Sequence, residues 1–131
     1  MPPRAADPFV PAPGLGHPHL QTIVGKYARQ WRSVPTVRRR IELRDGDFVD
    51  VDSAAAGEGA PGVLVLHGLE GSSNSGYVQQ VMRRFQQAGW AAHALNFRGC
   101  SGEPNRHAKA YSSGAFDDVL EVLQQVPNVR A

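Results

Sequence analysis

Residues 62–71 read Gly62-Val63-Leu64-Val65-Leu66-His67-Gly68-Leu69-Glu70-Gly71, and this stretch decides the fold class. Its first half is a continuous apolar run, which is typical of a strand buried on both faces in a parallel sheet. Apolar side chains then recur at helical spacing over 77–88, and Gly89 is the expected stop. Residues 90–95 predict the following strand. Together these segments predict one βαβ unit with a right-handed crossover.

The segments on either side extend this unit into a larger α/β sheet. Upstream, residues 37–43 and 48–52 predict two strands that are joined by a turn at Asp45-Gly46. Downstream, a long loop over 96–114 leads into a helix that ends before Pro127. Such a helix calls for another parallel strand, because the sheet otherwise leaves apolar surface exposed. We therefore expect the N-terminal part of a larger α/β protein, with an incomplete sheet and with 128–131 as the lead-in to a further strand.

The N-terminal segment has a different composition. Residues 1–19 hold six prolines, which exclude a helix or a central strand and predict an extended arm. Residues 20–131 form the predicted α/β portion, and it opens with a helical stripe made of Leu20, Ile23, Val24, Tyr27 and Trp31. His17 and His19 could ligate a metal, but no third ligand is nearby, and a solvated or hydrogen-bonded pair is the favoured interpretation.

Composition and charge narrow the class of protein. The chain has 131 residues, 41% hydrophobic and 20% charged, with a net charge of +2, which fits one globular domain and argues against a nucleic-acid partner. One Cys excludes an internal disulfide framework and a multi-Cys zinc site. No apolar run approaches the length of about 20 residues that a transmembrane helix needs. We expect a cytoplasmic protein.

The Arg38-Arg39-Arg40 run could bind phosphate or a membrane, although an exposed strand edge is favoured.

The turn after the apolar strand is the first candidate site. Ligands bind at the carboxyl ends of strands in open α/β sheets, and glycines let backbone amides come close to a ligand. Residues 67–71 could therefore present amides to an oxyanion, or they could be a glycine-rich turn with no catalytic role. The turn is not a phosphate-binding P-loop, because Gly-Lys-Ser/Thr is absent. Glu70 could act as an acid or a base, but a lone Glu in a loop is more often solvated.

No nucleophile elbow of the form Gly-x-Ser-x-Gly occurs in the sequence. The string Gly99-Cys100-Ser101-Gly102 comes near, but its second glycine falls one position early. Cys100 could be a nucleophile if a histidine lay beside it, whereas an ordinary buried or partly buried thiol is the favoured interpretation.

Several strings in this chain resemble the YheT-like branch of the α/β-hydrolase superfamily, a group of carboxylesterases and acylglycerol lipases. The resemblance covers about residues 17–118 in the order of that family. It rests on His19-Leu-Gln-Thr22, Leu43-Arg-Asp-Gly-Asp-Phe-Val-Asp50, His67-Gly-Leu-Glu-Gly-Ser72, Asn96-Phe-Arg-Gly-Cys-Ser-Gly-Glu-Pro-Asn105, and Tyr111-x-Ser113-Gly114. The Arg98–Asn105 part of these strings is specific to the branch, whereas His-Gly alone is shared by many α/β hydrolases.

The resemblance implies a mostly parallel, eight-stranded sheet and a Ser-Asp-His triad. We assign no catalytic triad residue to this chain, because the implied elbow and its partners come later in the family. By resemblance, Gly68 and Leu69 form part of an oxyanion hole, with the Leu69 N–H as the donor. His67 and Gly71 would support that turn. The signature loop is made of Arg98, Gly99, Cys100, Ser101 and Gly102, and bracing of the loop is favoured over substrate contact.

The resemblance predicts a serine hydrolase that acts on small carboxylic esters of short or medium acyl chains, or on monoacylglycerols, without a metal or organic cofactor. The chain by itself should be inert, marginally stable and prone to associate. Its oligomeric state is left open. The alternative is a non-enzymatic α/β module that binds a partner through an exposed sheet edge, and a third possibility is an enzyme that uses Cys100.

Overall fold

The computed structural model describes residues 8–27, 33–112 and 114–129, and the chain divides into two units, residues 1–30 and 31–131. In the first unit, residues 8–17 have no regular structure and helix α1 (Pro18–Tyr27) follows them. The expectation that residues 1–19 exclude a helix is therefore wrong for Pro18 and His19, because a proline is tolerated in the first turn of a helix. Leu20 and Ile23, on the predicted helical stripe, are exposed, and Trp31 lies outside the described residues. The predicted boundary between an arm of residues 1–19 and the remaining chain stays a prediction.

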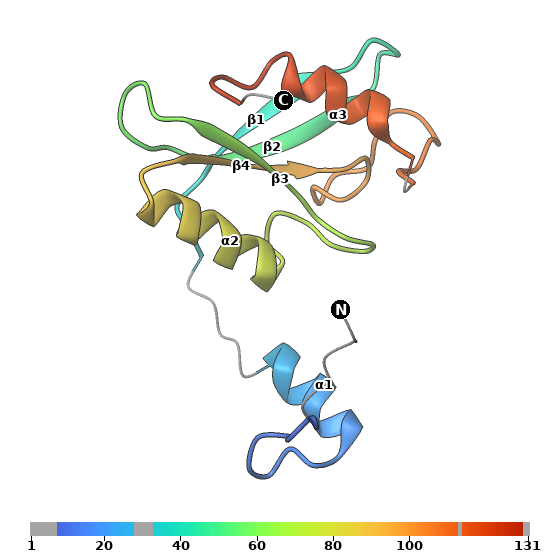
Figure 1. Cartoon of the computed structure of the whole chain (residues 1–131). Helices are drawn as coiled ribbons and strands as arrows, with labels where there is room; N and C mark the ends of the chain where they lie inside the picture. The colour runs from blue at the N-terminus through green and yellow to red at the C-terminus, as the bar shows by residue number, and fades with distance from the viewer. Residues whose placement is uncertain (1–7, 28–32, 113, 130–131) are drawn as a thin grey trace, which may run out of the picture. The chain divides into compact units, whose positions relative to one another are not determined.

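The second unit is a four-stranded sheet with helices on its faces (Figure 1). The strands are β1 (Val37–Glu42), β2 (Phe48–Ala54), β3 (Gly62–Leu66) and β4 (Ala91–Asn96), in the order β1-β2-β4-β3. β2 is antiparallel to both β1 and β4, and β3 is parallel to β4. Helix α2 (Gly76–Gln87) connects the parallel pair, and α3 (Phe116–Leu123) follows the long loop after β4. The α/β fold class and the predicted βαβ unit are therefore confirmed.

The sheet has an apolar core on each face, because side chains alternate along every strand. Leu95 and Phe97, at the end of β4, pack toward α3, and Ala92 and Ala94 pack toward α2. The core under α3 is made of Ile41, Leu43, Val49, Val51, Leu95, Phe97, Val122 and Val126. The core under α2 is made of Val34, Ala54, Val65, Val78, Met82, Ala92 and Ala94. Figure 1 shows α2 and α3 on opposite sides of the sheet.

β3 is less buried than its sequence predicts. Val65 is buried, but Val63 and Leu64 are only half-buried and Leu66 is 43% exposed. The expectation of a strand buried on both faces is wrong for these three residues, because β3 is the edge strand of the sheet among the described residues. On the outer side of β3, Gly62 forms a parallel bridge with Val129, and the Gly62 N–H donates to the Asn128 carbonyl at 2.9 Å. Residues 128–129 thus lie along this edge, as the predicted lead-in requires.

The arginines of β1 occupy the opposite edge of the sheet. The Arg38 guanidinium donates to both Asp52 carboxylate oxygens at 2.8 Å, and Arg40 donates to Asp50 at 2.9 and 3.0 Å. The charges of these two arginines are compensated within the sheet, which supports the strand-edge interpretation over a phosphate or membrane patch. In the described part of the chain, no helix is long and apolar enough to cross a bilayer.

Candidate functional site

The turn that follows β3 is compact and leaves no room for a side chain at Gly71. The Gly71 N–H donates to the Gly68 carbonyl at 3.0 Å, which closes the turn. A Cβ at Gly71 would lie 3.0 Å from the Gly68 oxygen, from the His67 Cβ and from the Tyr77 hydroxyl. Glu70 has a φ of 54°, an uncommon value for a residue with a side chain. The turn is therefore held in one specific shape.

His67 uses both of its ring nitrogens within the protein. The Phe97 N–H donates to His67 Nε2 at 3.2 Å, so Nε2 must accept and carries no proton. The remaining proton then lies on Nδ1, which donates to the Gly68 carbonyl at 2.8 Å. The ring joins the start of the turn to the end of β4, and both of its nitrogens are hydrogen-bonded to backbone groups.

Two tyrosine hydroxyls accept hydrogen bonds from the amides on either side of Leu69. The Gly68 N–H donates to the Tyr77 hydroxyl at 2.6 Å, and the Glu70 N–H donates to the Tyr111 hydroxyl at 2.7 Å. Among the described residues, the Leu69 N–H has no hydrogen-bond partner. The Leu69 side chain is 88% exposed. The turn thus presents one free amide between two that are occupied.

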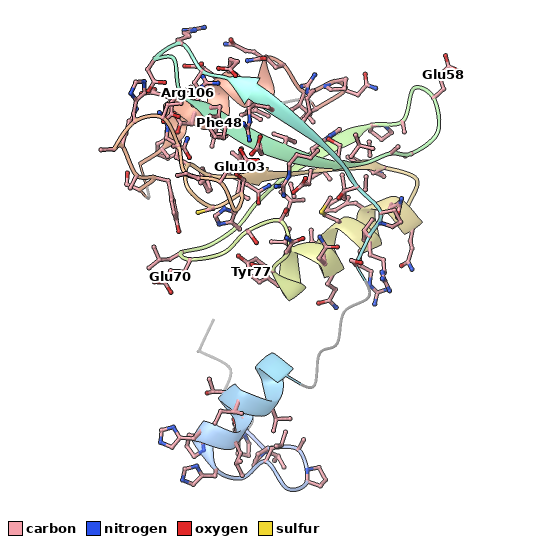
Figure 2. All side chains as sticks on the ribbon, turned by 180° about the vertical axis from the view of Figure 1, so that it is seen from behind. Phe48, Glu58, Glu70, Tyr77, Glu103 and Arg106 are labelled. Carbon is pink, nitrogen blue, oxygen red and sulfur yellow. The ribbon has the colours of Figure 1, made fainter. Side chains whose placement is uncertain are left out.

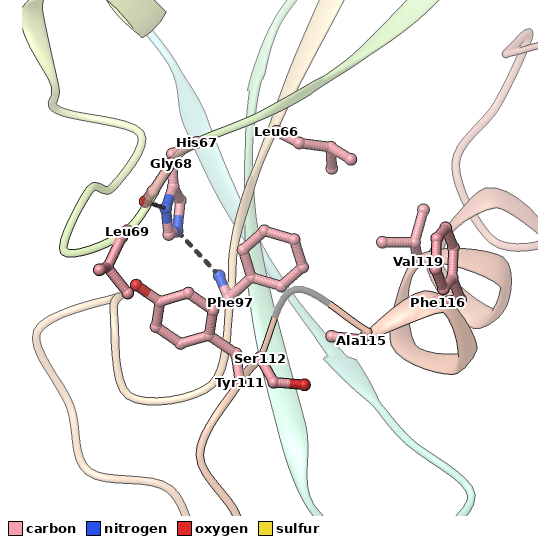
Figure 3. A pocket seen from close by; sticks show the side chains of 10 residues that line it. All are labelled: Leu66, His67, Gly68, Leu69, Phe97, Tyr111, Ser112, Ala115, Phe116 and Val119. Atoms are coloured by element: carbon pink, nitrogen blue, oxygen red, sulfur yellow. Dashed lines mark hydrogen bonds between the residues drawn. The ribbon is translucent and has the colours of Figure 1, made fainter.

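A cavity of about 590 Å³ adjoins this turn (Figure 3). The turn residues His67, Gly68 and Leu69 line one part of it. The rest is contributed by the end of β3, the end of β4, the loop before α3 and the first turns of α3, through Leu66, Phe97, Tyr111, Ser112, Ala115, Phe116 and Val119. No carboxylate, lysine or arginine is among these residues, so the cavity suits an uncharged, largely apolar group.

The signature loop after β4 is held in place by Arg98. The Arg98 side chain is 2% exposed and donates to both oxygens of Asp118 at 2.7 and 2.8 Å. The same guanidinium contacts Asp47 at 3.0 Å and Asp45 at 2.8 Å. The Asp118 carboxylate holds the pKa of Arg98 above its ordinary value. Arg98 therefore ties the end of β4 to α3 and to the β1–β2 turn.

The rest of the loop is fastened to the same β1–β2 turn. Asn105 donates to the Asp47 carboxylate at 2.9 Å and to the Phe48 carbonyl at 2.6 Å, and its own side-chain oxygen accepts from the Gly99 N–H. The Ser101 carbonyl accepts from Arg38 at 2.8 Å. Burial would raise the pKa of Asp47, but hydrogen bonds led by that from Asn105 hold it at about 2. None of the loop residues 98–105 is among the residues that line the cavity.

The backbone conformation accounts for the two glycines of the loop, and burial accounts for the state of its thiol. Gly99 and Gly102 adopt φ of 75° and 96°, which a glycine accepts without strain. Cys100 is half-buried, and burial raises the pKa of its thiol. None of the described histidines is bonded to it. A thiol in this state is a poor nucleophile, so the geometry gives no support to an enzyme that uses Cys100.

Sequence reasoning missed a buried polar network behind the turn. Asp52 accepts from the Ser73 hydroxyl at 2.5 Å and from the Asn96 amide at 2.9 Å, in addition to Arg38. Asn96 in turn accepts from the Ser73 N–H at 2.8 Å, and Gln79 donates to the Ser73 carbonyl at 2.6 Å. Burial would raise the pKa of Asp52, but these hydrogen bonds hold it below its ordinary value. The network anchors the segment between the turn and α2.

A signal for this network was present in the sequence. Arginines at 38 and 40 precede the turn, and aspartates at 50 and 52 follow it at matching distances. A hairpin closed at Asp45-Gly46 sets them opposite one another, as the observed pairs Arg38↔Asp52 and Arg40↔Asp50 confirm. The acids that alternate with Val49 and Val51 are therefore buried and paired, and they do not form a solvated face.

The two N-terminal histidines lie next to each other in the first unit. The His19 N–H donates to His17 Nδ1 at 3.3 Å, and the ring centroids are 5.1 Å apart. Within the described ranges, no group of three or more His, Cys, Asp or Glu side chains is placed to hold a metal ion. The geometry matches a hydrogen-bonded pair.

Solved structures identify the class of fold. The chain superposes on the structure of DcsB in complex with its substrate analogue with a TM-score of 0.60 and 12% identity, over 72% of this chain and 33% of that one. It superposes on esterase Est22 with a TM-score of 0.55 and 13% identity, over 74% of this chain and 32% of that one. At such low identities the likeness concerns the fold alone, which is a mixed α/β sheet with four strands among the described residues of this chain.

Curated relatives narrow the family. The chain is 41% identical over 119 residues to the "Putative esterase YheT" of Escherichia coli (strain K12), which is 88% of this chain and 35% of the relative. It is 32% identical to an "Abhydrolase domain-containing protein" of Dictyostelium discoideum, over 88% of this chain and 31% of the relative. It is 28% identical to the "Embryogenesis-associated protein EMB8" of Picea glauca, over 91% of this chain and 28% of the relative. No family model matches.

Sequence and fold thus agree. This is a chain of the YheT-like branch of the α/β-hydrolase superfamily, as its motifs predicted. The chain spans about a third of the length of the curated relatives it matches.

Proposed function

We propose that this chain supplies the oxyanion-binding turn of a serine carboxylic-ester hydrolase, with the Leu69 N–H as one of the donors. The observation that carries the proposal is the free Leu69 amide, which lies between two amides bonded to tyrosine hydroxyls and belongs to a residue that lines an apolar cavity. An amide that is already held in place before the reaction stabilises a developing negative charge without the cost of reorganising.

In the proposed reaction this chain supplies one oxyanion donor, and the serine and histidine are residues that we do not assign to this chain. A serine would attack the acyl carbonyl, and a histidine would take the serine proton and pass it to the leaving alcohol. The carbonyl oxygen becomes negative in the tetrahedral intermediate, and the Leu69 N–H would share it with the amide that follows the serine. We assign none of the triad residues to this chain. We therefore expect the 131-residue chain by itself to be inert.

The cavity and the relatives support a proposed substrate class. The lining of the cavity near Leu69 is uncharged, and this supports a small ester with an apolar acyl group, of short or medium length, or a monoacylglycerol. The relatives named as an esterase and as an abhydrolase support the same chemistry. We propose that the protein works in the cytoplasm and uses no cofactor.

The alternative is a module that binds a partner through the outer edge of β3. Leu66, Phe116 and Leu120 are 43%, 72% and 55% exposed, which favours contact with another surface. This alternative needs neither a free Leu69 amide nor a serine nucleophile.

The two functions are separated by labelling the gene product as its source makes it. A fluorophosphonate, which reacts with activated serines, should label the native protein, and the protein should hydrolyse p-nitrophenyl butyrate. Intact mass measured on the same sample identifies the labelled species. A native product that takes up no label and leaves the ester intact would overturn the hydrolase and leave the binding module.

A further inference from the structure

We propose that Tyr77 and Tyr111 are positioning residues of the oxyanion-binding turn: their hydroxyls hold the Gly68 and Glu70 amides so that the Leu69 N–H alone is presented to the cavity. This inference rests on the proposed function. It adds two side chains that lie outside the turn, one in α2 and one in the loop before α3, 9 and 41 residues along the chain from the amides they bind.

Tyr77 holds the first half of the turn. It is the second residue of α2, and Figure 2 shows its ring at the start of that helix. Its hydroxyl accepts from the Gly68 N–H at 2.6 Å and lies where a side chain at Gly71 would otherwise be, 3.0 Å from the ideal Cβ position. The start of α2 is itself fixed, because Gln79 donates to the Ser73 carbonyl at 2.6 Å. The hydroxyl is thus held on the concave side of the turn by a rigid element.

Tyr111 holds the second half of the turn from the other direction. Its ring stacks on Phe97 with centroids 5.3 Å apart and an interplanar angle of 10°. The edge contact between the Tyr111 and His67 rings, at 5.8 Å, restricts the ring further. Figure 3 shows the hydroxyl end of Tyr111 directed toward Leu69, where it accepts from the Glu70 N–H at 2.7 Å.

The two hydrogen bonds have complementary effects. Glu70 adopts a φ of 54°, which costs energy for a residue with a side chain, and the bond from its N–H to Tyr111 favours that conformation. The bond from Gly68 to Tyr77 fixes the other end of the turn. The two bonds therefore restrict the turn on both sides of Leu69, and a donor that is fixed before the reaction is what oxyanion stabilisation requires.

The test measures amide hydrogen exchange in the ¹⁵N-labelled chain with the variants Tyr77→Phe and Tyr111→Phe. In the parent chain the Leu69 amide should exchange faster than those of Gly68 and Glu70. Tyr77→Phe should speed exchange at Gly68 about tenfold and leave Glu70 unchanged, and Tyr111→Phe should do the reverse, because each removes one hydrogen bond. Each variant is the matched control for the other, because both remove one tyrosine hydroxyl and each affects a different amide of the turn.

Exchange at Val65 in β3 separates positioning from a loss of stability. A variant that only destabilises the fold would speed exchange at Val65 together with the turn amides. Unchanged exchange at Gly68 and Glu70 in their respective variants would overturn the proposal, and so would a Leu69 amide as protected as its neighbours. None of these outcomes depends on turnover, so a failure of the hydrolase proposal is a separate result.

The same variants in the native hydrolase give the functional measurement. kcat per serine titrated with fluorophosphonate should fall about tenfold in each Tyr→Phe variant while KM stays unchanged, because the oxyanion exists only in the transition state and the intermediate. A raised KM with unchanged kcat would show that the tyrosines act on substrate binding, and it would overturn the positioning role.

Discussion

Gly71 has no space for a methyl group, and three atoms would meet it at 3.0 Å, two of them part of the turn itself. We predict that Gly71→Ala displaces the turn and destabilises the chain by about 1–3 kcal/mol, as overpacking usually does. Urea unfolding measures the change. Gly57→Ala is the matched control, because nothing lies within 4 Å of a Cβ there. Equal unfolding midpoints for the two variants would show that the turn can yield without cost.

His93 makes the stability of the fold depend on pH. It is 6% exposed, Nδ1 is bonded to the Ser53 hydroxyl at 2.9 Å, and Nε2 is buried without a partner. Burial first, and then the charge of Arg39, lower its pKa. In the unfolded chain His93 titrates near pH 6.5, so as the pH falls the unfolded state takes up a proton before the folded state does.

The contribution of His93 to the free energy of unfolding should therefore be fully present above about pH 7. It should decline as the pH falls below about 6.5, by at most about 1.4 kcal/mol per pH unit. His93→Leu should flatten that part of the profile, measured as urea midpoints between pH 7.5 and 5.5. The exposed His17 provides the control in His17→Leu. A profile equally steep in the parent chain and in His93→Leu would assign the dependence to other groups.

At the scale of elements, the ion pairs of Arg98 connect the end of β4 to α3 and to the β1–β2 turn. Arg98→Met would leave the carboxylates of Asp47 and Asp118 buried without their cation. Breaking a buried ion pair on one side costs about 3–5 kcal/mol, and we predict a loss of that size in the free energy of unfolding. Arg106→Met is the control, because its pair with Glu42 is exposed and should matter much less. A comparable loss of unfolding free energy in both variants would contradict this connecting role of Arg98.

The elements themselves were largely predictable from local pattern. The apolar run at 62–66 and the helical stripe that follows it lie within a residue or two of β3 and α2, and the strands at 37–43 and 48–52 were found in the same way. Local pattern could not show that β3 lies at the edge of the sheet, so the exposure of Leu66 was missed. Strand order depends on contacts between segments far apart in the chain, and no short window of sequence contains them.

The candidate site likewise has residues that the sequence predicted and residues that it did not. The motif pointed to Gly68 and Leu69, because the resemblance and the local glycines both mark that turn. Tyr77 and Tyr111 could not be found from the motif, since Tyr77 reaches the turn from α2 and Tyr111 from the loop before α3. Their hydroxyls become relevant only when the fold brings three segments together.

At the scale of the whole molecule, the surface formed by β3 and α3 is the feature that should control behaviour in solution. Leu66, at the end of β3, and Phe116, at the start of α3, are large apolar side chains that are exposed. We predict that the chain associates and that its melting temperature depends on concentration, because an exposed strand edge beside apolar surface favours pairing. Sedimentation and melting at two concentrations tenfold or more apart measure this.

Leu66→Lys should reduce the association, whereas Val37→Lys, on the opposite edge strand and 75% exposed, should leave it unchanged. A monomer with a sharp, reversible melt that is independent of concentration would contradict the prediction.

The measurement that tests the central proposal most directly compares Leu69→Pro with Leu69→Ala in the native ester hydrolase. The first variant removes the backbone N–H, and the second keeps it and removes most of the side chain. If Leu69 donates to the oxyanion, Leu69→Pro should lower kcat per titrated serine about 10²–10³-fold, while Leu69→Ala stays close to the parent. Equal kcat values in the two variants would show that the free amide of this turn takes no part in the reaction.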